Sequence, residues 1–218
     1  MLLNVLAQIN DLTGSGQVES VIDLMMKGGI IMIPIILLSL ISVYIFFDKL
    51  FYIRNSAKID AGFVPAIITE IKNKKPENAI NLAKNQGRSV GRIMESGLEQ
   101  LGKPVKEVEH FMESTTNIEV AQMEKNTGYL GIIAGIAPML GFVGTIAGVI
   151  KIFYGISMTD NISIGIIAGG LYQKMICSGT GLIVGVIAYA AYHYLQIRID
   201  KFTHALQKNV LEFMKSIE

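Results

Sequence analysis

Hydroxyl and amide side chains lie inside or beside two long uncharged stretches of this 218-residue chain. Thr145 lies in the first stretch, Ser178 and Thr180 lie in the second, and Gln173 shortly precedes the second. Polar groups are costly in an apolar medium unless they are hydrogen-bonded, so these side chains have either a packing role or a chemical one. They could line a polar path for water or protons. For Thr145 the alternative is a bond back to the Gly141 carbonyl of its own helix.

Neither stretch contains an aspartate or a glutamate. Hydroxyls and amides do not titrate usefully near neutral pH. A proton path through a membrane usually needs a group that takes up and releases a proton. If this chain passes protons, we therefore expect a partner protein to supply the acid.

Small residues follow the same two stretches at steps of three and four, which places them on one face of each helix. Such faces let helices in lipid pack closely. The predicted packing residues are Gly131, Gly135, Pro138, Gly141, Gly144, Gly148, Gly181 and Gly185.

Lys151 and Lys174 are the charged residues nearest to these polar side chains. Their aliphatic stems could cover apolar surface while the ammonium groups reach lipid headgroups. The alternative is a functional contact with an acidic partner.

Three uncharged runs are long enough to cross a membrane, because a ~30 Å apolar core needs about 20 helical residues. Lipid offers no partners to backbone groups, so the spans must be helical. The sequence therefore predicts an all-α integral membrane protein with three transmembrane helices. The predicted spans are residues 27–50, 126–156 and 164–197, and a turn at 157–163 joins the last two. In this antiparallel hairpin, Thr145 and Ser178 are about equally far from the turn, so we expect them at similar depth.

Basic residues indicate the orientation in a bacterial inner membrane. Twelve of the 19 Lys and Arg residues lie from Lys49 to Lys125, and four more follow the third span. The positive-inside rule then places the C-terminus in the cytoplasm and the N-terminus in the periplasm. Residues 198–218 are expected to form a cytoplasmic C-terminal helix. Residues 1–26 form either an amphipathic helix on the outer membrane surface or a frayed terminus.

Residues 51–125 are expected to form a cytoplasmic helical domain. Pro76 suits the first turn of one helix, Gly87 suits its end, and Pro104 begins a later helix. Nothing after Pro104 breaks the helical pattern, so the sequence predicts one helix to about Phe153 that projects into the cytoplasm. Its length would be roughly 75 Å at 1.5 Å per residue. The domain either caps the membrane part or forms a stalk that meets other copies.

The composition excludes several classes of protein. Hydrophobic residues make up 51% of the chain and charged residues only 17%, with a net charge of +1. This balance gives no electrostatic case for a nucleic-acid partner. No cluster of His, Cys, Asp or Glu has catalytic or metal-ligand spacing, so no cofactor or metal is expected and an enzyme is disfavoured.

Two segments resemble the MotA/TolQ/ExbB proton-channel family. Residues 137–148, APMLGFVGTIAG, resemble the second-span signature of the family. Residues 28–53, GGIIMIPIILLSLISVYIFFDKLFYI, resemble its first span. Three spans with an outside N-terminus fit the ExbB/TolQ branch, and the similarity covers nearly the whole chain.

The resemblance implies a ring of five such subunits around two single-span partners of the ExbD/TolR type, each carrying a membrane aspartate. Thr145 matches the second-span threonine of the family, Ser178 falls at the third-span threonine, and Gln173 stands where a glutamate often lies. The implied function is a proton-driven motor that moves a TonB-like transducer and energises TonB-dependent transport. The alternatives are a TolQ-like motor for envelope maintenance and a structural scaffold for a single-span partner without proton conduction.

Overall fold

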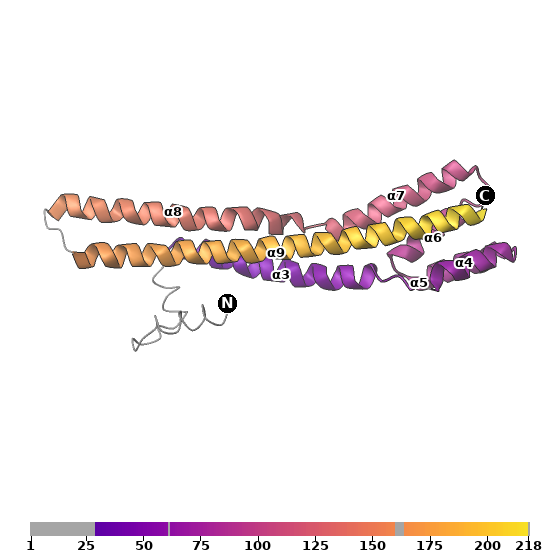
Figure 1. Ribbon diagram of the computed structural model, residues 1–218, viewed down its shortest axis with the longest axis horizontal. Coiled ribbons are helices and arrows are strands. Elements are labelled where there is room, and N and C mark those ends of the chain that lie inside the picture. The colour runs from indigo at the N-terminus through magenta and orange to yellow at the C-terminus, as the bar shows by residue number, and fades with distance from the viewer. Residues whose placement is uncertain (1–28, 61, 160–163, 218) are drawn as a thin grey trace, which may run out of the picture. The chain divides into compact units, whose positions relative to one another are not determined.

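The computed structural model describes residues 29–60, 62–159 and 164–217, and it forms helices without strands in these ranges. Figure 1 shows their order along the chain. The helices are α3 (Met32–Ser56), α4 (Phe63–Lys72), α5 (Pro76–Gln86), α6 (Ser89–Leu98), α7 (Val105–Glu124), α8 (Gly128–Thr159) and α9 (Ile164–Ile217). The predicted all-α fold is confirmed.

Three helical segments are long and apolar enough to cross a membrane. They lie within Met32–Ser56, Val105–Met158 and Ile167–Ile217. The prediction of three spans is therefore confirmed. The N-terminal segment predicted at residues 1–26 and most of the turn predicted at 157–163 lie outside the described residues.

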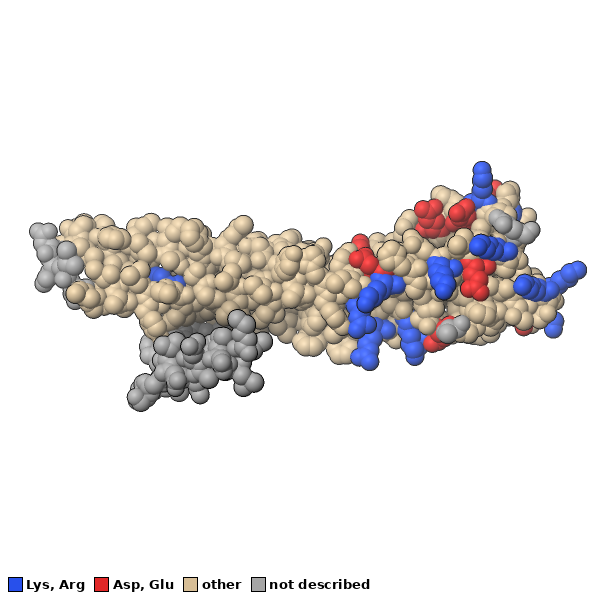
Figure 2. All heavy atoms as spheres, viewed as in Figure 1, with Lys and Arg blue, Asp and Glu red and all other residues tan. Residues whose placement is uncertain are grey.

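The chain divides into two compact units. The first, here called the hairpin unit, contains the described residues up to Leu38 and those from Gly135 to Gly185. The second, here called the helical unit, contains residues from Ser39 to Ala134 and those from Val186 to the end. On the face seen in Figure 2, acidic and basic side chains gather over the helical unit and are nearly absent from the hairpin unit.

In the hairpin unit, α8 and α9 run antiparallel with their apolar side chains outward. Phe142 on α8 is 62% exposed and Met175 on α9 is 70% exposed. Large exposed apolar side chains on a water-soluble protein would be a liability. They suit helices whose outer surface contacts lipid or another membrane helix.

The helical unit buries a core of aliphatic and methionine side chains drawn mainly from α4 to α7 and α9. The expected helix ends are confirmed: α5 begins at Pro76, and Gly87 ends it with a φ of 63°. Pro104 directly precedes α7. Gly87 suits this position because a residue without a Cβ adopts the left-handed conformation at little steric cost.

The helix predicted without a break from Pro104 to about Phe153 is divided in the structure. α7 ends at Glu124, and Asn126 has a φ of 68° before α8 begins. Asn tolerates the left-handed region better than most residues. Thr127 completes the turn, because both its amide and its hydroxyl donate to the Glu124 carbonyl, at 3.0 and 2.8 Å. The predicted helix is therefore two helices, α7 and α8, joined by a short turn.

The last helix is continuous where the sequence predicted a boundary. α9 continues without interruption through the boundary expected near Arg198 and extends from Ile164 to Ile217. Its 54 residues correspond to about 80 Å of helix at 1.5 Å per residue. Since this exceeds the ~30 Å apolar thickness of a bilayer, part of the helix must extend beyond the membrane.

Candidate functional site

The backbones of α8 and α9 contact each other directly at two glycines. A Cβ placed on Gly181 would lie 2.6 Å from the Ala137 carbonyl oxygen, and one on Gly141 would lie 3.0 Å from the Ser178 Cα. Real Cβ atoms essentially never approach a heavy atom as closely as 2.6 Å, and a contact of 3.0 Å is tighter than nine in ten of theirs. Glycine is therefore needed at both positions for the helices to approach this far, as in other close helix pairs in lipid.

Further along the same face, side chains of α9 occupy the space beside glycines of α8. A Cβ on Gly144 would lie 2.8 Å from the Sγ of Cys177, which is buried. The aliphatic stem of Lys174 lies across Gly148, where it would overlap any added Cβ. The glycine face of α8 thus accommodates both a thiol and a lysine stem.

Thr145 lies between these glycines and joins the two helices. Its side chain is half-buried, and its Oγ1 lies 3.1 Å from the Gly141 carbonyl oxygen and 3.3 Å from the Lys174 carbonyl oxygen. A hydroxyl has one proton, so it donates to one acceptor at a time. The local bond considered from the sequence is present, and a second acceptor on the facing helix accompanies it.

The structure places Ser178 at the same seam between the helices but does not set it directly opposite Thr145. Ser178 is half-buried with its backbone against Gly141, whereas Thr145 faces the Lys174 carbonyl. One helical turn, about 5.4 Å, separates the two levels. The two hydroxyls therefore lie at similar depth to within a turn.

Thr180 is not brought to this seam. The Thr180 hydroxyl donates to the Ile176 carbonyl of its own helix at 2.9 Å. Thr180 follows Ser178 by two residues, and residues two apart on a helix point in nearly opposite directions. The side chain of Gln173 lies outside what the structure describes.

The remaining predicted packing residues lie in varied surroundings. A Cβ on Gly131 would make ordinary contact with the Tyr192 ring at 4.0 Å, and one on Gly135 would meet nothing within 4 Å. Pro138 is half-buried inside α8, and Gly185 is buried.

Lys174 is a half-buried cation without an acid nearby. Its Nζ lies 3.9 Å from the position of a Cβ on Gly29, at the start of the segment that leads into α3. No aspartate or glutamate occurs among the described residues of the hairpin unit, so no internal carboxylate neutralises this charge. Lys151, by contrast, is exposed.

The contact of Lys174 with Gly148 was missed by sequence reasoning, although a signal for it exists. Positions 148 and 174 are equally far from Asn161, so the pairing rule that relates Thr145 to Ser178 also pairs them to within one residue. Within the described ranges, no three His, Cys, Asp or Glu residues come close enough together to hold a metal ion.

Comparison with known proteins places this arrangement in context. Residues 85–208, more than half of the chain, match the family model described as the MotA/TolQ/ExbB proton channel family. A homolog of the biopolymer transport protein ExbB from Methanothermobacter thermautotrophicus is 26% identical over 184 residues, which cover 83% of this chain and 64% of the relative. The chain thus spans less than two thirds of that relative's length.

Two further relatives come from bacteria. The biopolymer transport protein exbB1 of Vibrio cholerae is 24% identical over 201 residues, which cover 90% of this chain and 87% of the relative. The Tol-Pal system protein TolQ of Haemophilus influenzae is 25% identical over 96 residues, which cover 44% of this chain and 42% of the relative.

Proposed function

Because this chain belongs to the MotA/TolQ/ExbB proton channel family, we propose that it is the ring-forming subunit of a motor driven by the proton-motive force. The motor lies in the inner membrane, with the N-terminus of each subunit in the periplasm and the C-terminus in the cytoplasm. It couples proton flow to TonB-dependent transport across the envelope. The names of the relatives, as biopolymer transport proteins, support this role.

The observation that carries the proposal is the seam of α8 and α9 around Thr145. It presents hydroxyl and carbonyl groups between two glycine-rich membrane helices, and its described residues include no acid. Such groups can solvate a proton carrier, but none of them titrates near neutral pH. The carrier is therefore a carboxyl group on a single-span partner of the ExbD/TolR type.

In this mechanism, protonation of the partner's carboxylate removes the desolvation penalty of a charge that faces apolar surface. The neutral side chain can then move past the seam and release its proton on the other side. One elementary charge that moves through 100 mV supplies about 2.3 kcal/mol. Several protons together drive a conformational step that a TonB-like transducer carries into the periplasm.

The test is the double variant Thr145→Val with Ser178→Ala in the full complex, reconstituted in liposomes with an imposed proton gradient. We expect proton entry to fall sharply, because Val has the shape of Thr without its hydroxyl. Thr145→Ser, which keeps the hydroxyl, should retain most of the flux. Ser157→Ala is the matched control, because Ser157 is an exposed residue of α8 whose hydroxyl donates to the Tyr154 carbonyl of its own helix. Unchanged flux in the double variant would exclude the seam as the path.

A scaffold that holds a single-span partner without conducting protons is the second candidate. The cross-helix contact of Thr145 with the Lys174 carbonyl favours it, because this contact serves packing as well as chemistry. The mass of the detergent-extracted complex separates the two functions. A scaffold loses its partner in the double variant, whereas a motor keeps the same assembly and loses only the flux.

The similarity to TolQ leaves a second process open to the same motor, namely envelope maintenance. Deletion of the gene distinguishes the processes. Loss of TonB-dependent uptake with an intact envelope supports the proposed role, whereas leakage of periplasmic proteins with normal uptake supports a TolQ-like role.

A further inference from the structure

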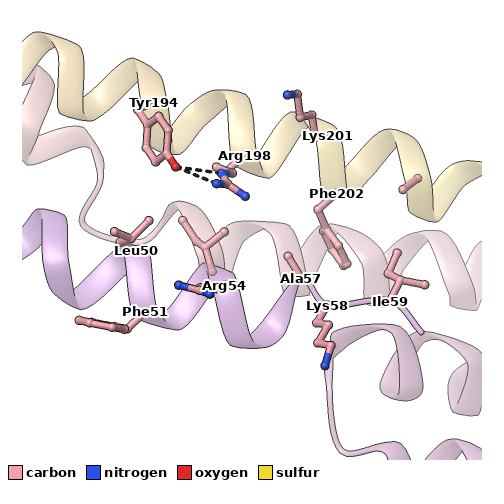
Figure 3. Close-up of a pocket in the computed structure, with 12 residues that line it drawn as sticks. Leu50, Phe51, Arg54, Ala57, Lys58, Ile59, Tyr194, Arg198, Lys201 and Phe202 are labelled. Carbon is pink, nitrogen blue, oxygen red and sulfur yellow. Dashed lines mark hydrogen bonds between the residues drawn. The ribbon is translucent and has the colours of Figure 1, made fainter. Parts of the chain in front are cut away.

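A cavity of about 820 Å³ lies in the helical unit between the end of α3 and the middle of α9. Figure 3 shows lining side chains that approach it from both helices. The lining residues are Leu50, Phe51, Ile53, Arg54, Ala57, Lys58, Ile59, Tyr194, Arg198, Lys201, Phe202 and Ala205.

The polar part of this lining is entirely basic or phenolic. Arg54, Lys58, Arg198 and Lys201 contribute four cations, and none of the twelve lining residues is acidic. All four are exposed, and within the part of the chain that the structure describes, none of them forms an ion pair. Figure 3 shows the ammonium groups of Lys58 and Lys201 pointing away from the space between α3 and α9. The lining still carries several cations and no acid, which favours an anionic ligand.

One of these cations is held in place. The Tyr194 hydroxyl accepts hydrogen bonds from the Arg198 Nε at 3.3 Å and the Nη2 at 2.7 Å, drawn as dashed lines in Figure 3. The guanidinium also lies 5.3 Å from the Tyr194 ring centre. Among the residues that the structure describes, the Nη1 of Arg198 has no hydrogen-bond partner, and a guanidinium whose orientation is fixed is well suited to bind phosphate.

The depth of the cavity indicates the source of the anion. The uncharged run of the first span ends at Phe47, directly before Asp48, and that of the third span ends at Ile197, directly before Arg198. The cavity begins at these two ends and therefore lies where the apolar core of a bilayer meets its headgroups. Leu50 and Phe51, at the membrane end of the cavity, form an apolar wall of the kind that lipid chains contact.

We propose that this cavity binds the phosphate headgroup of an anionic phospholipid, with Arg54 and Arg198 as the principal phosphate ligands. Basic pockets between membrane helices, near a membrane surface, bind such headgroups. The acyl chains lie along the apolar wall toward the bilayer core. The binding is independent of proton conduction and does not rest on the proposed motor function.

Native mass spectrometry of the detergent-purified full chain tests the proposal. The protein is titrated with phosphatidylglycerol, with phosphatidylcholine, and separately with inorganic phosphate. We expect retention of phosphatidylglycerol well above that of phosphatidylcholine, with a preference that falls as ammonium acetate is raised, because the attraction is screened. Equal retention of both lipids would overturn the proposal. Phosphate that displaces phosphatidylglycerol at comparable concentration would identify a soluble anion as the ligand and would also overturn it.

The variant Arg54→Gln with Arg198→Gln should weaken phosphatidylglycerol binding by at least about tenfold, since each basic residue near a membrane surface contributes about 1 kcal/mol. The matched control, Lys208→Gln with Lys215→Gln, removes the same charge from exposed positions of α9 outside the cavity. Equal weakening in both variants would show a nonspecific charge effect and contradict the site. If the double arginine variant fails to fold, the unmodified chain still tests the proposal. Its preference for phosphatidylglycerol over phosphatidylcholine must be present and must fall as salt is raised.

Discussion

The hairpin unit and the helical unit each contain a glycine that another part of the chain approaches closely, but the approaching groups differ. A Cβ on Gly181 would lie 2.6 Å from the Ala137 carbonyl oxygen, and one on Gly97 would lie 2.5 Å from the Met112 Sδ. The carbonyl cannot move without its helix, whereas the thioether ends a flexible side chain. Nearly equal distances therefore impose a strict requirement for glycine at position 181 and a mild preference at position 97. The helical unit contains one close backbone approach as well, because a Cβ on Gly91 would lie 2.6 Å from the Ala83 carbonyl oxygen.

The two units also differ in what holds most of their helices together. Lipid tails are as apolar as leucine, so α8 and α9 gain little from burying side chains and rely on close backbone approach. The helical unit instead buries side chains such as Met112, which is fully buried, and gains from the hydrophobic effect. It also contains a paired charge, Arg92 with Glu119, of a kind that the described residues of the hairpin unit lack.

The largest effect is expected from Gly181→Ala. The added Cβ would force the two helix backbones apart, and overpacking of this kind costs about 1–3 kcal/mol or more. The thermal unfolding midpoint of the full protein in detergent should fall clearly. Gly179→Ala is the matched control on the same helix, because a Cβ there would meet nothing within 4 Å. Equal midpoints for the two variants would refute the close approach.

The next effect is expected from Glu119→Gln. The Arg92 Nε and Nη2 each donate to a Glu119 oxygen at 2.6 Å, and the Glu119 side chain is only 8% exposed. Hydrogen bonds to charged groups contribute about 1.5–3 kcal/mol. Hydrogen exchange of the α6 and α7 amides should accelerate accordingly, whereas exchange in α8 near Thr145 should not change. Unchanged protection in α6 and α7 would show that the pair contributes nothing.

The Arg92–Glu119 pair should also make the stability of the helical unit depend on pH, with a smaller effect. The hydrogen bonds from Arg92 hold the pKa of Glu119 below its ordinary value, and bonding to Glu119 raises the pKa of Arg92. The unfolded chain therefore binds more protons at mildly acidic pH. The stabilisation by Glu119 is present above the ordinary glutamate pKa of about 4.3 and is lost as pH falls below it. Exchange in α6, corrected for the intrinsic rate, should show this loss in the wild type and not in Glu119→Gln.

The smallest effect is expected from Gly97→Ala. Movement of the Met112 side chain should relieve the contact, and alanine gains up to about 1 kcal/mol of helix propensity over glycine. The net change in unfolding free energy should lie below about 1 kcal/mol, and Met112→Leu should alter it measurably because the two side chains share the space. A loss as large as that of Gly181→Ala would show that distance alone, rather than the mobility of the approaching group, decides the cost.

The features that the sequence predicts well are those set by local chemistry. Apolar length defines the three spans, and Pro76, Gly87 and Pro104 mark helix ends because each restricts its own backbone. The break at Asn126 was missed, because Asn takes a positive φ only in some contexts and fits a helical pattern equally well.

Features that depend on how helices face each other could not be predicted to the same degree. Counting from the hairpin turn brings Thr145 and Ser178 to within one helical turn, but it does not fix the rotation that gives Thr145 the Lys174 carbonyl as an acceptor. Arg92 and Glu119 lie on different helices and are 27 residues apart in sequence, so their pairing leaves no local signal.

Proton flux through the reconstituted complex tests the central claim most directly, with Thr145→Val and Thr145→Ser measured side by side. If the seam of α8 and α9 carries the proton path, Val abolishes most of the flux, Ser restores it, and both complexes have the wild-type mass. Wild-type flux with Val at position 145 would contradict the account, because the hydroxyl would then have no part in proton transfer.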